Sequence, residues 1–129
     1  VPSITLKSMM KVNDYQKKAL RTLNPSLSKS EILINGVMGL CGESGEAIDI
    51  VKKHLAQGHA LDREGLIKAQ GHKLDRENLA KELGDVAWYL AETAYALDYD
   101  LESIFQMNLD KLAKRYPHGF EKEKSIDRD

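Results

Sequence analysis

Apolar residues recur at three- and four-residue spacing along most of the chain, and no stretch alternates apolar and polar positions for long. This pattern predicts helices rather than strands, so we expect an all-α fold. Ser28 and Glu31 have the spacing of a capping box, which marks the start of a helix. Pro25 and Pro117 each disfavour helix in the residue before them. Four helices are expected, over residues 13–23, from about 28 to 57, 75–97 and 100–116.

The expected second helix is apolar on two sides. One line consists of Leu33, Val37, Leu40, Ala47 and Val51, and the other of Ile34, Met38, Cys41 and Ile48. A helix that packs on one core shows a single apolar stripe. In a chain of 129 residues the second stripe indicates a subunit interface, so we expect a homodimer or homotetramer. Cys41 lies in this run and is expected to be a buried small hydrophobe.

Residues 56–81 hold a tandem repeat of thirteen residues, with ten of the thirteen positions identical. Two copies are too few for a solenoid, and long loops cost little closure entropy. We therefore expect a tolerated surface insertion between two helices. The domain itself is expected at residues 13–120. Residues 1–12 are expected to be an N-terminal extension, in part left over from expression of the chain, and residues 121–129 a charged tail that frays into solvent.

The charge balance narrows the classes of partner. The chain has 19 Lys and Arg against 20 Asp and Glu, a formal net charge of −1, and a length typical of one domain. A binder of nucleic-acid polymers or of membrane surfaces would carry a basic excess, so neither partner is expected. No apolar stretch reaches the roughly 18 residues of a membrane span, and a single cysteine permits neither an intrachain disulfide nor a Cys-based zinc site. We expect a cytoplasmic protein.

Two pairs of carboxylates carry the strongest chemical signal, Glu43 with Glu46 and Glu82 with Asp85. Residues three apart lie on one side of a helix, so two such helices packed antiparallel would bring four carboxylates together. Divalent cations would relieve the repulsion, and oxygen-only ligation indicates Mg²⁺, with Mn²⁺ as a substitute. The alternative is that these are ordinary solvated helix residues.

Glycines favour a site over a solvated surface. Gly36 and Gly39 lie on the same stripe as Glu43 and Glu46, and each costs roughly 1 kcal/mol relative to alanine inside a helix. Close approach of another backbone or of a ligand would explain them. The four histidines form neither HExxH nor Glu-x-x-His, which argues against a zinc protease and against a di-iron bundle.

Asn108, Lys111 and Arg115 share one face of the expected fourth helix. Such a face can hold phosphate oxygens, or it can be a solvated surface that compensates the helix dipole. The same two interpretations apply to Lys53, which follows the first acidic pair.

Taken together, three motifs resemble the MazG-like all-α nucleoside triphosphate pyrophosphohydrolases. They are GLCGESGEA at residues 39–47, ELGDVAWY at 82–89 and NLDKLAKRYPHGF at 108–120, and the resemblance extends over roughly Asp14 to Phe120. It implies a four-helix MazG-like bundle assembled as a homo-oligomer. The residues implied to bind Mg²⁺ are Glu43, Glu46, Glu82 and Asp85. Those implied to contact the triphosphate are Lys111 and Arg115, with Asn108 beside them. The sequence departs from the family in the 35 residues between the acidic pairs, a gap that deletion of one repeat copy would make ordinary.

The implied reaction is hydrolysis of a nucleoside triphosphate, a dNTP or a non-standard NTP, to the monophosphate and pyrophosphate by a metal-activated water. Glu46 or Glu82 would orient or deprotonate that water, and both stand as catalytic candidates. Tyr89 or Trp88 would stack on the base, although either could equally be a core or interface aromatic. The alternative function is a catalytically inactive helical dimerisation or regulatory module of the same fold.

Overall fold

The computed structural model describes residues 10–56 and 74–126, and these form helices without a strand. The elements are α1 (Val12–Ala19), the 3-10 turn η1 (Leu20–Thr22), α2 (Lys29–Ala56), α4 (Arg76–Ala96), α5 (Leu101–Arg115) and α6 (Lys122–Ile126). The all-α prediction is therefore confirmed. The described ranges contain five α-helices, however, and not the four that the sequence predicts.

The four predicted helices end within a few residues of their expected positions, and the difference in number comes from α6. It occupies most of the tail that was expected to fray. The Ser125 N–H donates to the Glu121 carbonyl at 3.3 Å, and Lys124 forms an ion pair with the Glu121 side chain at 3.7 Å. These local contacts give the tail one helical turn. Most of the tandem repeat lies at residues 57–73, outside the described residues, so its role as a surface insertion stays a prediction.

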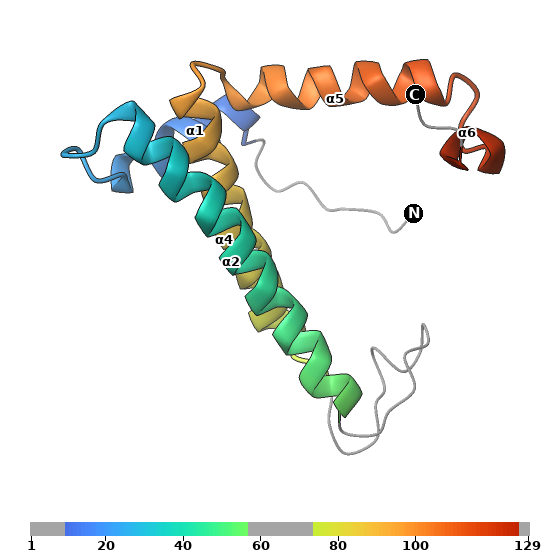
Figure 1. The fold of residues 1–129 in the computed structure, drawn as a ribbon, viewed down its shortest axis with the longest axis horizontal. Helices are drawn as coiled ribbons and strands as arrows, with labels where there is room; N and C mark the ends of the chain where they lie inside the picture. Colours follow the sequence, from blue (N-terminus) through green and yellow to red (C-terminus); the bar gives the residue numbers. More distant parts are fainter. Residues whose placement is uncertain (1–9, 57–73, 127–129) are drawn as a thin grey trace.

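Helices α2 and α4 lie side by side and antiparallel along their lengths (Figure 1). Glycines on α2 make the close approach possible. A Cβ atom at Gly39 would lie 2.1 Å from the Tyr89 ring, and one at Gly36 would lie 2.3 Å from Thr93 Oγ1. The side chains of α4 thus fill the space that α2 leaves open. This explains two of the glycines as the sequence predicted, through close approach of a neighbouring helix.

The amide of Gln16 is one of the contacts that tie α1 to the rest of the fold. Gln16 is buried, and its Nε2 donates to the carbonyls of Ala91 and Tyr99, each at 3.3 Å, while its Oε1 accepts from the Leu101 N–H at 2.8 Å. Around this amide the small core forms. Its buried members are Ala91, Ala94 and Leu101, with Val12, Tyr15, Leu90 and Ile104 packed against them.

Helix α5 leaves the α2–α4 pair at its start and extends away from it (Figure 1). Asp100 caps the helix by accepting the Ser103 N–H at 2.7 Å, and hydrogen bonds from Ser103 lower the pKa of that carboxyl group. Beyond its first turns, α5 exposes its apolar side chains, among them Met107 at 56% and Leu109 at 57%. The described chain alone therefore does not close into the four-helix bundle that was expected, because α5 packs on α1 and α4 only near its first turns.

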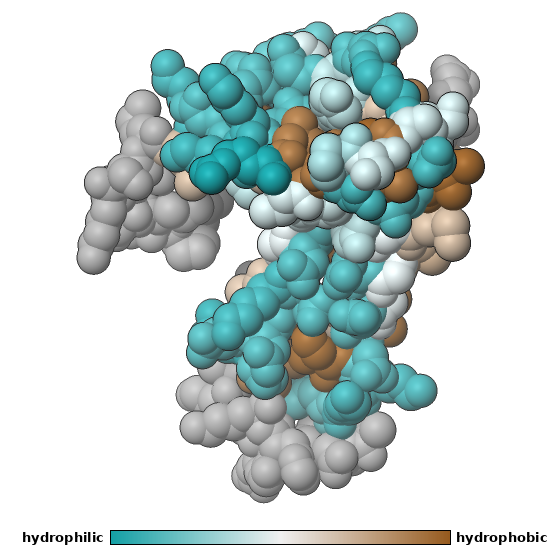
Figure 2. All heavy atoms as spheres, turned by 90° about the vertical axis from the view of Figure 1, so that its left-hand side faces the viewer, coloured by the Kyte–Doolittle hydropathy of each residue, from teal (hydrophilic) through white to brown (hydrophobic). Residues whose placement is uncertain are grey.

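The outer apolar line of α2 is also exposed, with Ile34 at 60%, Met38 at 69% and Ile48 at 67%. Cys41 belongs to this line and is exposed, so the expectation of a buried cysteine is wrong for the single chain. The reason is that α4 covers only the opposite side of α2. Figure 2 shows hydrophobic side chains at the surface among hydrophilic ones, both near the top and lower along the helix pair.

Substitutions at two glycines of α2 should separate packing from intrinsic helix propensity. G39A should lower the free energy of unfolding by about 1–3 kcal/mol, because the new methyl group must displace the Tyr89 ring. G42A should raise it by up to about 1 kcal/mol, because a Cβ there meets nothing within 4 Å. Urea denaturation of both variants measures the two effects. Equal shifts in the same direction would show that the two helices do not meet at Gly39.

A candidate metal-binding acidic site

Two helices supply the four predicted carboxylates, Glu43 and Glu46 from α2 and Glu82 and Asp85 from α4. One carboxylate oxygen from each of Glu43, Glu82 and Asp85 lies within 4.8 Å of the others. Glu46 is exposed and lies close enough to Glu82 to influence the pKa of that residue. The antiparallel pairing therefore brings the two acidic motifs to one place.

The crowding of carboxyl groups raises the pKa of Glu82. The close contact of the Glu82 carboxyl group with Glu43 is the main cause that raises the pKa of Glu82 above its ordinary 4.5. Burial and the negative charges of Glu43 and Asp85 raise it further, while the contact with Glu46 opposes the shift. Mutual repulsion between carboxylates favours the protonated form of Glu82.

The chemistry of the cluster fits a divalent cation. Oε2 of Glu43 and Oε2 of Glu82 are buried and have no hydrogen-bond partner in the part of the chain that the structure describes. A buried acceptor left without a donor costs free energy, and a cation would supply the missing positive charge. The donors are oxygens only, as Mg²⁺ and Mn²⁺ prefer. Glu43, Glu82 and Asp85 are the residues that would hold the ion, with Glu46 beside them.

Tyr89 lies one helical turn beyond Asp85, with its half-buried ring against Gly39. The neighbouring Trp88 meets it edge to face, with ring centroids 5.0 Å apart. The Trp88 indole N–H is already occupied, since it donates to Thr22 Oγ1 at 2.8 Å and to the Ala19 carbonyl at 3.1 Å. Of the two aromatics, Trp88 fastens the end of α1, and Tyr89 lies beside the acidic cluster.

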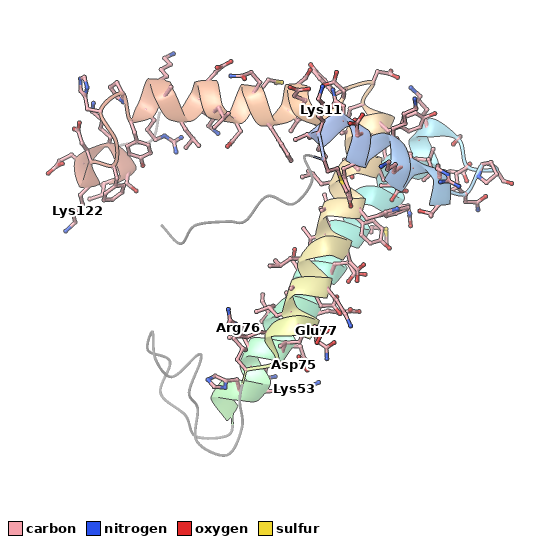
Figure 3. All side chains as sticks on the ribbon, turned by 180° about the vertical axis from the view of Figure 1, so that it is seen from behind. Lys11, Lys53, Asp75, Arg76, Glu77 and Lys122 are labelled. Atoms are coloured by element: carbon pink, nitrogen blue, oxygen red, sulfur yellow. The ribbon has the colours of Figure 1, made fainter. Side chains whose placement is uncertain are left out.

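The predicted basic residues lie elsewhere. Lys53 is exposed near the end of α2, level with the start of α4 (Figure 3), and pairs with Asp49 at 3.0 Å. Asn108, Lys111 and Arg115 are on α5, which leaves the helix pair, and no hydrogen bond or ion pair described in the structure joins them to the acidic residues. The single chain thus assembles the acidic half of the predicted site without its basic half.

The structure adds residues that sequence reasoning missed. Tyr15 on α1 lies near the cluster, where burial and then the charge of Asp85 raise the pKa of its hydroxyl group. Farther along the helix pair, Asn35 Nδ2 donates to Glu92 Oε1 at 2.9 Å. Glu92 carries a signal in the sequence, because it lies seven residues after Asp85 and so on the same helix face. Tyr15 carries none, since only the packing of α1 brings it close.

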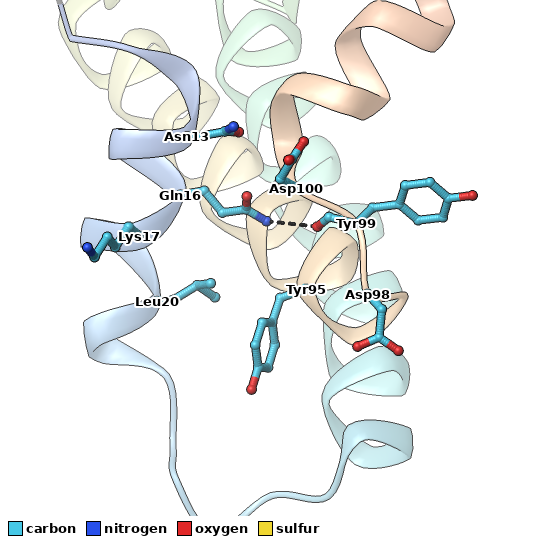
Figure 4. A pocket seen from close by; sticks show the side chains of 8 residues that line it. All are labelled: Asn13, Gln16, Lys17, Leu20, Tyr95, Asp98, Tyr99 and Asp100. Atoms are coloured by element: carbon cyan, nitrogen blue, oxygen red, sulfur yellow. Dashed lines mark hydrogen bonds between the residues drawn. The ribbon is translucent and has the colours of Figure 1, made fainter.

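Hollows also mark the surface of the residues that the structure describes. One, of about 410 Å³, lies between α1 and the turn after α4, where the Gln16 amide points to the Tyr99 carbonyl (Figure 4). It is lined by Asn13, Gln16, Lys17, Leu20, Tyr95, Asp98, Tyr99 and Asp100, and contains none of the predicted site residues. The other, of about 310 Å³, is almost wholly apolar and is lined by Ala47, Ile48, Val51, Lys52 and Leu79. It places apolar surface within one helical turn of Glu46 and Glu82.

Replacing Glu82 with glutamine should stabilise the metal-free protein in a pH-dependent way. The folded chain binds the Glu82 proton more tightly than the unfolded chain does, so wild-type stability falls as the pH rises from 4.5 through the raised pKa. E82Q lacks this titration. Its melting temperature in EDTA should therefore exceed that of the wild type most at neutral pH, and the gap should close in acid. A gap that does not change with pH would contradict the raised pKa of Glu82.

Comparisons with known proteins agree with the geometry. Residues 35–120 match the family model of the MazG nucleotide pyrophosphohydrolase domain. The chain is 43% identical over 82 residues to the Gene 37 protein of Mycobacterium phage L5, a match that covers 64% of each of the two chains. No solved structure gives a significant match, and no helix in the described ranges is both long and apolar enough to cross a membrane. Because the family model covers most of the chain, including both acidic motifs, this protein belongs to the MazG nucleotide pyrophosphohydrolase domain family.

Proposed function

We propose that the protein hydrolyses a nucleoside triphosphate to the monophosphate and pyrophosphate in a reaction that depends on Mg²⁺. The observation that carries the proposal is the convergence of Glu43, Glu82 and Asp85, with two buried carboxylate oxygens that lack a partner among the described residues. Membership of the MazG family supports the same reaction class. A bound Mg²⁺ would supply positive charge to the phosphate oxygens and to the pyrophosphate that leaves.

Within the site, Glu46 is the best candidate for the general base. Glu43, Glu82 and Asp85 converge and would hold the ion, whereas Glu46 is exposed at the edge of the same cluster. Its carboxylate can accept the proton of the water that attacks the α-phosphorus as the bond to the β-phosphate oxygen breaks. Tyr89 offers a ring face on which the base can stack.

Assembly into a homo-oligomer can bring basic side chains to the acidic site. Both the outer line of α2 and the far part of α5 expose apolar side chains, which a folded protein ordinarily covers. We propose a homodimer, or a homotetramer built from it, in which α5 of one copy lies beside the acidic site of the other. Asn108, Lys111 and Arg115 would then bind the triphosphate, together with Lys53. This arrangement brings the basic face to the opposite charge and covers the apolar lines at once.

Pyrophosphate release from a panel of dNTPs and modified NTPs tests the reaction. With Mg²⁺ the wild type should cleave at least one of them, and E46Q should lower kcat by about a hundredfold or more, because the water loses its base. E77Q is the matched control, since Glu77 is exposed on α4 and pairs with Lys81. If no triphosphate is cleaved although Mg²⁺ raises the melting temperature, the catalytically inactive regulatory module becomes the better function.

Mixing two weakly active variants tests whether one site is built from residues of two copies. E82Q damages the acidic half, and R115A damages the basic half, so each variant alone should be weakly active. If α5 serves the neighbouring copy, refolding the two together should restore about a quarter of the wild-type sites, because half of the dimers are mixed and each has one intact site. If α5 serves its own chain, the mixture should be no more active than its parts.

A further inference from the structure

A fully buried acid lies outside the acidic cluster. Glu92 is 0% exposed and is the largest side chain buried to that degree among the described residues. Its Oε1 accepts from Asn35 Nδ2 at 2.9 Å, and its Oε2 is buried without a hydrogen-bond partner in the described part of the chain. Burying a carboxylate with incomplete hydrogen bonding is costly. Stability alone therefore does not explain an acid at this position.

Glu92 lies on the same helix pair as the acidic cluster, farther along it. It lies two helical turns, about 10 Å, beyond Asp85 on α4, and Asn35 lies eight residues, about 12 Å, before Glu43 on the antiparallel α2. Tyr89, packed on Gly39, comes between the two levels. The order along the helix pair is thus carboxylates, aromatic ring, and then the Asn35–Glu92 pair. Asn35 is exposed as a residue, and its hydrogen bond with Glu92 is partly buried.

The hydrogen bond with Glu92 fixes how Asn35 is turned. The amide nitrogen of Asn35 faces Glu92, because Nδ2 donates to the Glu92 Oε1 acceptor. The carbonyl oxygen Oδ1 is then left as an acceptor. An asparagine on a free surface could present either end of its amide, whereas this one presents its oxygen.

We propose that Asn35, oriented by Glu92, selects the nucleobase by accepting a hydrogen bond from an exocyclic amino group. The inference rests on the proposed function, with the triphosphate at the carboxylates and the base on Tyr89. Adenine and cytosine carry an amino group at the position where hypoxanthine, guanine, uracil and thymine carry a keto oxygen. A keto oxygen would face Oδ1 with no hydrogen between them. The favoured substrates are therefore adenine or cytosine nucleoside triphosphates.

Paired substrates that differ only in this group provide the test. The ratio of kcat/KM for dCTP over dUTP, or for dATP over dITP, should be about tenfold or more in the wild type. N35L removes the acceptor and should bring that ratio close to one while the poorer substrate is still cleaved. E92Q should have the same effect, because a glutamine can donate to Asn35 and so let its amide reverse. N24A, which alters an exposed asparagine outside the site, should leave the ratio unchanged.

Two further measurements separate selection of the base from a structural role. Calorimetric binding of dCMP against dUMP, or of dAMP against dIMP, should show the same preference without turnover and lose it in N35L. E92M should melt at a higher temperature than the wild type, since it removes a buried oxygen that lacks a hydrogen-bond partner among the described residues. A wild type that cleaves triphosphates with ratios unaltered by N35L and E92Q overturns the inference alone. A wild type that cleaves none overturns the proposed reaction, and equal binding of the monophosphates then overturns the inference as well.

Discussion

The close contact between α2 and α4 is the constraint on which the rest of the structure depends. Helix α2 has no side chains at Gly36 and Gly39. Thr93 and Tyr89 of α4 occupy the space that is left. Two antiparallel helices held this closely must place acidic motifs at matching levels next to one another. The electrostatic strain of the cluster is thus a result of packing, and the packing free energy of the helix pair maintains it.

The local features of the fold could be predicted from the sequence, because they depend on neighbouring residues. Spacing of apolar positions, the cap at Asp100 and the prolines set where helices begin and end. The convergence of Glu43, Glu82 and Asp85 could also be predicted, since i, i+3 spacing and antiparallel pairing suffice. Two short motifs therefore suffice to predict the acidic half of the site.

The remaining features depend on contacts between residues that are far apart in the sequence. The pattern of residues does not predict these contacts. The direction of α5 follows from how Gln16 meets Ala91, Tyr99 and Leu101, and no spacing rule foretells a buried amide. Cys41 could not be placed either. It lies in an apolar run, but whether such a run is covered depends on a partner that the pattern of one chain does not specify. The burial of Glu92 likewise depends on how closely α4 meets α2.

The anchoring of the first turn of α5 by Gln16 and Asn13 has a mechanical consequence. The helix is a rigid arm of 15 residues, about 22 Å long, held near one end. A rotation of a few degrees at its base moves the far end, where Arg115 lies, by a much larger distance than any change at the base itself. Substitutions around Gln16 would thus alter the position of a distant basic group without touching it. In the proposed homo-oligomer, the fit between two copies would therefore depend on the hydrogen bonds at the base of α5.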